Sequence, residues 1–396
     1  MYTILPGSFI VLQAIGLWKP HIHQKYNNNS SSLIYNFWYR FRTFVIFFLI
    51  YSFTITGITG LILTTENIGD ITSNCFILLS IFAICGKIAN IIWSRETIIL
   101  ILNTLETNPC KPINDNEIII QQKVDRFIWH STLFYGILTE ITVFMITFGT
   151  LLLKLPIGTL PYDTYLPWDY SHGFLYWLAY GYQIISVCLS ANSDIGFDTL
   201  VPGLMLQITA KLEILKYRFI NLVDTLKLTT HWNSNKNNKD NLKIENKLIA
   251  DYVKCHLIIL KLADTINETF NKVIFLQFFI SSIVLCISVY NLAILDAFST
   301  EFTSIVLYLS CMLTEIFILC AAGNQVTIVS STLSDAIYNT DWINLNTSTV
   351  KSLIIIMNRG QKPIIFSSGG VIKLSYDSFK TLIKMSYSVY NVLQRT

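Results

Sequence analysis

Residues 43–63 read TFVIFFLIYSFTITGITGLIL and contain no Asp, Glu, Lys or Arg. A helix rises about 1.5 Å per residue, so about 20 apolar residues cross the roughly 30 Å hydrocarbon core of a bilayer. The whole chain has this character, because only 13% of its 396 residues are charged, against about 25% in soluble proteins. Its mean hydropathy is +0.50. We expect an all-α integral membrane protein.

Six further apolar blocks follow, which gives seven predicted transmembrane helices in a single domain, residues 1–396. The predicted spans are residues 43–63, 71–93, 128–153, 173–197, 271–295, 303–329 and 372–394. The fourth is expected to continue through LMLQITAKLEIL (residues 204–215) into a longer helix.

Lys and Arg alternate between the connections. They occur before the first block and after the second, fourth and sixth, whereas the connection after the third has only Lys154 and those after the first and fifth have none. Basic residues collect on the cytoplasmic side of membrane proteins. This pattern predicts a cytoplasmic N-terminus and an extracellular C-terminus, the inverse of a G-protein-coupled receptor.

Three segments outside these blocks are informative. MYTILPGSFIVLQAIGLWKP (residues 1–20) is too short to span and predicts an amphipathic segment at the membrane interface, anchored by Trp18. LPIGTLPYDTYLPWDYSHG (residues 155–173) is stiff and aromatic, which suits either a lid over a cavity or an interfacial belt. TVKSLIIIM (residues 349–357) predicts a cytoplasmic helix, which Gly360 and Pro363 then terminate.

Enzyme signatures are missing from the sequence, which has no Walker loop, no HExxH and no nucleophile elbow. His21 and His23 have no partners at metal-site spacing, and the eight cysteines are scattered without a CxxC pair. A net charge of +3 without a basic tract does not suit nucleic acid. We therefore expect no enzyme activity, cofactor or metal, and no nucleic-acid partner.

Several motifs together resemble the insect odorant receptor family. They are IGLWKP (15–20), LPYDTYLPWDYS (160–171), LSANSDIGFDTL (189–200), LSDAIYNTDW (333–342), IIIMNRGQKP (354–363) and LSYDSFKTLIKMSYSVYNVL (374–393). The last three follow that family's closing motifs in order and at its spacing.

The resemblance implies a subunit of a ligand-gated cation channel, a heterotetramer with a shared co-receptor in the plasma membrane of olfactory neuron dendrites. Small volatile ligands would bind in the outer half, among the second, third, fourth and sixth spans. The last span would line the pore, and cytoplasmic parts of the fourth to seventh helices would join the subunits. The chain lacks the co-receptor's cytoplasmic insert, so it is similar to an odorant-specific tuning subunit.

Two alternatives stay open. Gustatory receptors end their last span with Thr-Tyr, five residues and Gln-Phe, whereas here six residues separate Tyr387 from Gln394 and Arg395 follows. A seven-helix G-protein-coupled receptor fits the predicted orientation less well.

Ligand candidates are apolar or aromatic side chains in the outer half of the spans, because volatile ligands are small and largely apolar. They are Leu79, Phe82, Phe144, Phe148, Tyr180, Ile184, Tyr308 and Met312. Each is equally compatible with packing inside the bundle or facing lipid.

Polar and small residues share one face of the last span. The pore and gate candidates are Ser388, Asn391, Val392 and Thr396. Alignment of the segment from Ser375 to Phe379 with the co-receptor's end places Val392 at that family's hydrophobic gate, where a nonpolar ring closes a pore by dewetting. The alternative is a helix-packing seam.

Carboxyl groups occur within or next to several predicted spans. Glu140 and Glu315 are candidates for either a functional or a structural role, because burying a carboxylate in a membrane is unfavourable. Asp194 and Asp198, in a run of small and polar residues, are expected to make helix contacts.

Overall fold

The computed structural model describes residues 4–19, 30–64, 68–152, 160–162, 164–168, 170, 173–229, 238–295, 299–343 and 345–393. Their helices are α1 (Pro6–Ala14), α2 (Ser30–Thr64), α3 (Ile68–Trp93), α4 (Arg95–Glu106), α5 (Asp115–Leu152), α6 (Phe174–Ile220), α7 (Leu222–Thr229), α8 (Asn238–Ile294), α9 (Thr300–Ser331), α10 (Leu333–Tyr338), α11 (Thr347–Gly360) and α12 (Tyr376–Leu393). Two short strands, β1 (Ser367–Ser368) and β2 (Ile372–Lys373), form a hairpin before α12.

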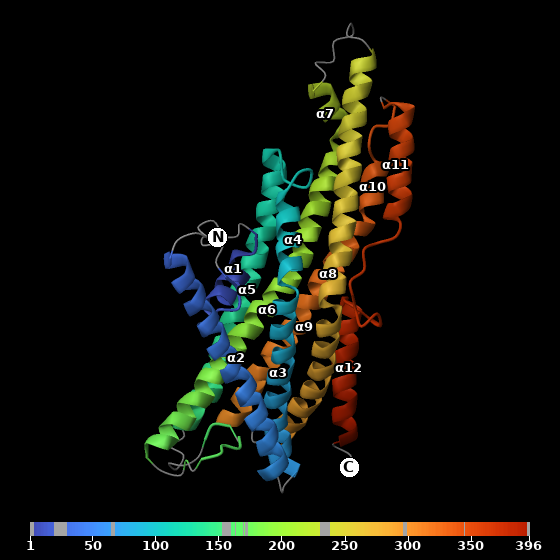
Figure 1. Ribbon diagram of the computed structural model, residues 1–396. Coiled ribbons are helices and arrows are strands. Elements are labelled where there is room, and N and C mark those ends of the chain that lie inside the picture. The colour runs from blue at the N-terminus through green and yellow to red at the C-terminus, as the bar shows by residue number, and fades with distance from the viewer. Residues whose placement is uncertain are drawn as a thin grey trace.

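Seven of these helices, α2, α3, α5, α6, α8, α9 and α12, overlap the seven predicted spans and form an elongated bundle (Figure 1). Among the described residues, four segments are long and apolar enough to cross a membrane: Phe37–Leu63, Phe174–Ile220, Leu242–Ala293 and Thr300–Tyr338. Ile77–Trp93 and Arg95–Glu106, bent by 64° at their junction, make a fifth. The membrane boundaries within the helices stay predictions.

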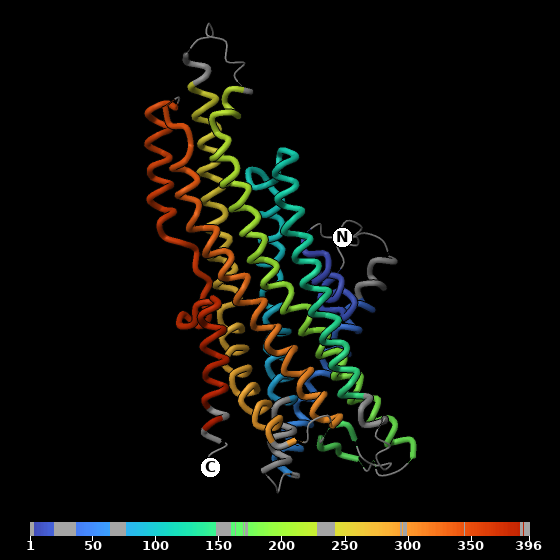
Figure 2. Tube along the Cα trace, turned by 180° about the vertical axis from the view of Figure 1, so that it is seen from behind, coloured from blue at the N-terminus to red at the C-terminus, as the bar shows by residue number. Residues whose placement is uncertain are grey.

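The two ends of the bundle differ in the connections that they carry. The α4–α5 connection, α7 and α11 lie toward one end, together with the long extensions of α6 and α8 (Figure 1). The α2–α3 junction, the segment before α6 and the C-terminal end of α12 lie at the other (Figure 2). The connections rich in Lys and Arg therefore share one end, as the alternation of charge requires.

The N-terminal segment packs into the bundle, so the expectation of an interfacial anchor at Trp18 was wrong. Trp18 and Leu12 are fully buried. The Trp18 ring lies 5.1 Å from that of Phe9 and 5.5 Å from the Arg95 guanidinium. A Cβ at Gly196 in α6 would come within 2.6 Å of Leu12, so the absent side chain lets α1 approach α6 closely.

Helix α12 begins at Tyr376, later than the predicted start of the last span at residue 372. Residues 372–373 instead form β2, which pairs antiparallel with β1. The turn between the strands contains Gly369 and Gly370, with φ of 61° and 70°, a conformation that side chains disfavour. The Leu374 N–H donates to the Phe366 carbonyl at 2.9 Å and closes the hairpin.

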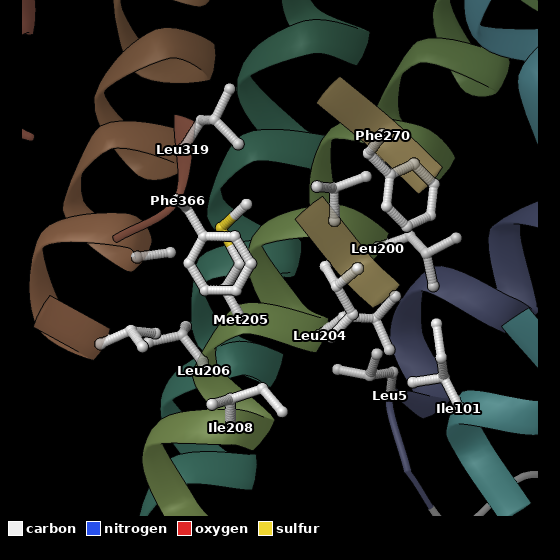
Figure 3. Packing of buried hydrophobic residues seen from close by; sticks show 14 of the residues in the cluster. Leu5, Ile101, Leu200, Leu204, Met205, Leu206, Ile208, Phe270, Leu319 and Phe366 are labelled. Atoms are coloured by element: carbon white, nitrogen blue, oxygen red, sulfur yellow. The ribbon is translucent and has the colours of Figure 1, made fainter. Parts of the chain in front are cut away.

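Helix α6 is the central element, with α1, α2, α3, α5, α8, α9 and α10 packed around it. Figure 3 shows its Leu200 and Leu204 between Leu5, which directly precedes α1, Ile101 of α4 and Phe270 of α8. All five are at most 2% exposed. Because other helices surround α6, its residues 195–212 form the longest run of buried residues in the described part of the chain.

Candidate ligand-binding site

A cavity of about 100 Å³ lies inside the bundle between α3, α5, α6 and α9. Its helical lining consists of Ile77, Ser80, Ile81 and Ile84 from α3, Tyr135, Thr139, Thr142, Val143 and Ile146 from α5, Val187, Ser190, Ala191 and Asp194 from α6, and Tyr308, Cys311, Met312 and Glu315 from α9. Each set repeats at steps of mainly three or four residues, so one face of each helix borders the cavity. On α3, α6 and α9, the first and last lining residues are seven positions apart, which makes the cavity about 10 Å long on those helices.

The outer end of the cavity is closed by Tyr162, from the connection between α5 and α6. Gln183 on α6 holds this segment: its Nε2 donates to the Tyr162 carbonyl and to Thr164 Oγ1, both at 2.8 Å, and its Oε1 accepts from the Tyr162 N–H at 3.2 Å. The Tyr162 ring packs edge-on against Phe53 of α2. Of the two interpretations of this aromatic segment, the lid is the one that these contacts support.

The inner end of the cavity borders a buried cluster of charges. Lys87 Nζ donates to Asp194 Oδ1 at 2.7 Å, to Asp198 Oδ2 at 2.8 Å and to Glu315 Oε1 at 2.7 Å. The lysine side chain is 2% exposed, and those of Asp198 and Glu315 are 4% and 3% exposed. Asp194 is 15% exposed and, like Glu315, lines the cavity.

Two neutral side chains complete this charge cluster, which we define as Lys87, Asp194, Asp198 and Glu315. Gln277 of α8 donates to Asp198 Oδ1 at 3.2 Å and to Glu315 Oε1. The Tyr135 hydroxyl, on α5, donates toward Asp194 and Asp198. The cluster thus ties α3, α5, α6, α8 and α9 together just below the cavity.

The three carboxylates bring oxygen atoms within 4.8 Å of one another, a spacing at which such groups can hold a metal ion. The Lys87 ammonium lies within 2.8 Å of all three carboxylates. It therefore supplies the positive charge that a metal ion would supply there.

Sequence reasoning missed Lys87 and underrated the carboxylates. Glu315 was left between a functional and a structural role, and Asp194 and Asp198 were assigned to helix contacts. The available signal was Lys87 itself, a basic residue within the predicted span 71–93, which calls for acidic partners in other spans.

The eight predicted ligand residues divide into four groups. Tyr308 and Met312 line the cavity, and the Tyr308 hydroxyl is hydrogen-bonded to Ser80 across it. Tyr180 is buried beside it and donates to the Thr147 carbonyl at 3.1 Å. The lining of the cavity does not include the half-buried Leu79 and Ile184, or Phe82 and Phe144, which are 48% and 54% exposed. The side chain of Phe148 lies outside the described residues.

Phe82 and Phe144 face outward because helical periodicity places them off the lining face. On α3 the cavity side is set by Ile77, Ile81 and Ile84, and Phe82 follows Ile81 by about 100° around the helix. An aromatic residue in the correct span was therefore not enough to identify the wall of the cavity.

The pore candidates lie at the end of α12. Ser388 is exposed and Asn391 is half-buried. Val392 belongs to α12 but its side chain is outside the described residues, as is Thr396 altogether. Glu140, the remaining predicted carboxylate, is exposed on α5 and accepts from Asn192 Nδ2 at 2.7 Å.

Comparisons with known proteins agree with this architecture. Residues 67–387 match the family model described as 7tm Odorant receptor. The chain is 29% identical over 265 residues to odorant receptor 46a, isoform A, of Drosophila melanogaster, a match that covers 66% of each protein. It is 26% identical over 232 residues to odorant receptor 67a of the same species, covering 58% of this chain and 54% of that one. The matches span between half and two-thirds of these relatives.

Among solved structures, the insect olfactory receptor OR5 from Machilis hrabei in complex with eugenol superposes with a TM-score of 0.83. The match covers 99% of this chain and 97% of that one at 17% sequence identity, which shows the fold. The expected class, an all-α membrane protein with seven transmembrane helices, is confirmed. The orientation of its termini stays a prediction.

Proposed function

Because the chain belongs to the 7tm odorant receptor family, and is therefore a multi-pass membrane receptor and not an enzyme, we propose that it is the odorant-binding subunit of a ligand-gated cation channel. The cavity between α3, α5, α6 and α9 is its ligand site. Its partner is the odorant receptor co-receptor, in a heterotetramer at the plasma membrane of olfactory sensory neuron dendrites.

The observation that carries this proposal is the cavity between the four helices, together with the tethered segment at its end. Its wall combines isoleucine and valine side chains with hydroxyl and carboxyl groups, which suits a small volatile ligand that has an apolar body and one polar group. Tyr162 and Gln183 close the outer end, so a bound ligand would be removed from water.

Filling the cavity tests this assignment. Met312 lines the cavity and is 7% exposed, so Met312→Trp places a bulky ring in the cavity. When this variant is co-expressed with the co-receptor, we expect odorants to evoke no current. Phe82→Ala is the matched control, because Phe82 lies on α3 outside the lining and should leave the responses unchanged. Normal odorant potency in the Met312 variant at normal surface expression would place the ligand elsewhere.

For the pore, we propose the last helix. Helix α12 lies at the edge of the molecule, packs against α8 and α9, and leaves Tyr387 and Ser388 exposed for contacts beyond this chain (Figure 1). A polar substitution at a dewetted constriction hydrates it. Val392→Ser should therefore raise the current without odorant, whereas Ser388→Leu should lower conductance. Unchanged conductance and resting current in both would make this face a packing seam.

Dependence on a partner tests the heteromer. We expect no robust odorant current from the chain expressed alone and restored current with the co-receptor. Strong currents from the chain by itself would contradict the proposed role as a tuning subunit. They would favour a gustatory-like channel that assembles without a co-receptor.

A further inference from the structure

Three hydroxyl groups of the cavity wall have their protons directed away from a ligand. Thr139 and Thr142 on α5 donate to the carbonyls of Tyr135 and Leu138, at 2.9 and 2.8 Å. Ser190 on α6 donates to the Ser186 carbonyl at 2.8 Å. A hydroxyl has one proton and two lone pairs, so these three groups can still accept hydrogen bonds but have no second proton to donate.

The inner end of the cavity is also rich in acceptors. Asp194 is the most exposed carboxylate of the charge cluster and lines the cavity. Its Oδ1 accepts from Lys87, and its Oδ2 accepts only a long 3.3 Å bond from Tyr135. A carboxylate oxygen can accept more than one hydrogen bond, so Asp194 has capacity for another donor.

Charge adds to this preference. The single Lys87 ammonium contacts three carboxyl groups, and its three N–H donors are all engaged. Three carboxyl groups therefore share one cation at the inner end of the cavity, and negative charge is in excess there when more than one of them is ionised. Because like charges disfavour one another when buried, a ligand that brings positive charge or a polarised N–H or O–H to Asp194 relieves this excess.

We propose that the preferred ligand is a small primary amine or alcohol that donates a hydrogen bond to Asp194 while its apolar body extends toward Tyr162. This inference rests on the proposed function and names the ligand class of the same cavity. The volume of about 100 Å³ is smaller than the cavity of about 150 Å³ that holds benzene, so it suits an apolar body of about four carbon atoms. Amines bind more tightly than alcohols, and both bind more tightly than molecules of equal shape that donate nothing.

A matched ligand series tests the class on the unaltered receptor. Butan-2-amine, butan-2-ol, butan-2-one and 2-methylbutane share a four-carbon body and differ at one substituent. Binding is measured as the ligand-induced rise in unfolding temperature of the purified complex with its co-receptor. We expect the amine and the alcohol to bind at least about tenfold more tightly than the ketone and the hydrocarbon. Equal or tighter binding of the ketone, or no binding of either donor, overturns the proposal.

Asp194→Asn then locates the contact. The amide has nearly the same shape and keeps one acceptor, but it removes the negative charge. We expect about tenfold weaker binding of butan-2-amine and unchanged binding of 2-methylbutane. Glu140→Gln is the control, because Glu140 is an exposed carboxylate outside the cavity lining and should change neither. Unchanged binding of butan-2-amine in the Asp194 variant contradicts the assignment.

Thr139→Val provides a second variant should the Asp194 variant fail to reach the membrane. It keeps the shape of a wall residue and removes one acceptor, so donors should lose affinity relative to the hydrocarbon, and an unchanged ratio counts against the proposal. If Met312→Trp prevents the binding of all ligands, but the unaltered receptor shows no preference for hydrogen-bond donors, the cavity is the ligand site and the proposed ligand class is wrong. Binding that survives Met312→Trp would refute the cavity itself.

Discussion

Arg218 and Lys87 are both buried cations, but their surroundings differ. Arg218, near the end of α6, donates to both oxygens of the Glu117 carboxylate, at 2.9 and 2.8 Å. Two further N–H groups donate to the carbonyls of Pro109 and Lys111, at 2.7 and 2.9 Å. One positive charge thus contacts one negative charge, and two neutral carbonyls accept from the same guanidinium.

Lys87 instead contacts three carboxyl groups beside a cavity. A charge-matched pair such as Arg218 and Glu117 fastens the α4–α5 connection to α6. An unmatched cluster retains negative charge that a ligand or protons must balance. The difference indicates that a buried ion pair is structural where the charges match, and that an excess of one sign beside a cavity is a candidate for function.

The largest effect is expected at the matched pair. Arg218→Met leaves Glu117, 3% exposed, without its partner, and this should lower the free energy of unfolding by about 3–5 kcal/mol. Thermal unfolding of the purified protein and surface expression would both report the loss. Lys227→Met is the control, because Lys227 is 52% exposed in its pair with Asp224, and its removal should change stability by less than about 0.5 kcal/mol.

A slightly smaller effect is expected at Lys87. Lys87→Met should lower the free energy of unfolding by about 3 kcal/mol, because three carboxyl groups lose their shared cation. Adding Glu315→Gln removes part of the remaining repulsion and should restore part of the stability. A double variant less stable than Lys87→Met alone would show that the cluster does not carry excess negative charge.

Neutralising one acid separates the two sites directly. Glu117→Gln removes the sole carboxylate that Arg218 contacts and should destabilise the fold by about 2 kcal/mol. Asp194→Asn leaves Lys87 two carboxyl partners and should change stability by less than about 1 kcal/mol. Equal losses in thermal unfolding would remove the distinction between a matched and an unmatched site.

The smallest effect is expected at the outer end of the cavity, away from the charges. Gln183→Met keeps the side-chain length but loses the hydrogen bonds to Tyr162 and Thr164. Ligand binding should weaken about fivefold, equivalent to about 1 kcal/mol, with faster dissociation through the loosened lid. Thr303→Val, at an exposed position of α9, should leave the ligand dissociation rate unchanged. A normal dissociation rate in the Gln183 variant would mean that the lid does not gate the ligand.

Local sequence patterns determined the membrane helices and the family. Long apolar runs such as residues 43–63 have few alternatives to a spanning helix, because an unpaired backbone is too unfavourable in hydrocarbon. The helix over residues 349–357 was also predicted and is found in α11, because amphipathic periodicity and Gly360 are local signals. Tyr308 and Met312 were named in advance, because they lie on the outer half of a span that the resemblance placed at the ligand site.

The tertiary structure alone decided which side chains meet. Lys87, Asp194 and Glu315 come from three helices far apart in the chain, and their contact depends on the rotation and depth of each helix, which hydropathy does not specify. The same rotation turned Phe82 away from the cavity and brought Ser80 to it. Trp18 is buried because α1 packs closely against α6 at Gly196. The fit between these two segments cannot be read from either segment's sequence alone. Membrane spans follow from hydrophobicity, which is a property of each residue by itself. Cavities and charge clusters depend instead on how the helices are positioned relative to one another.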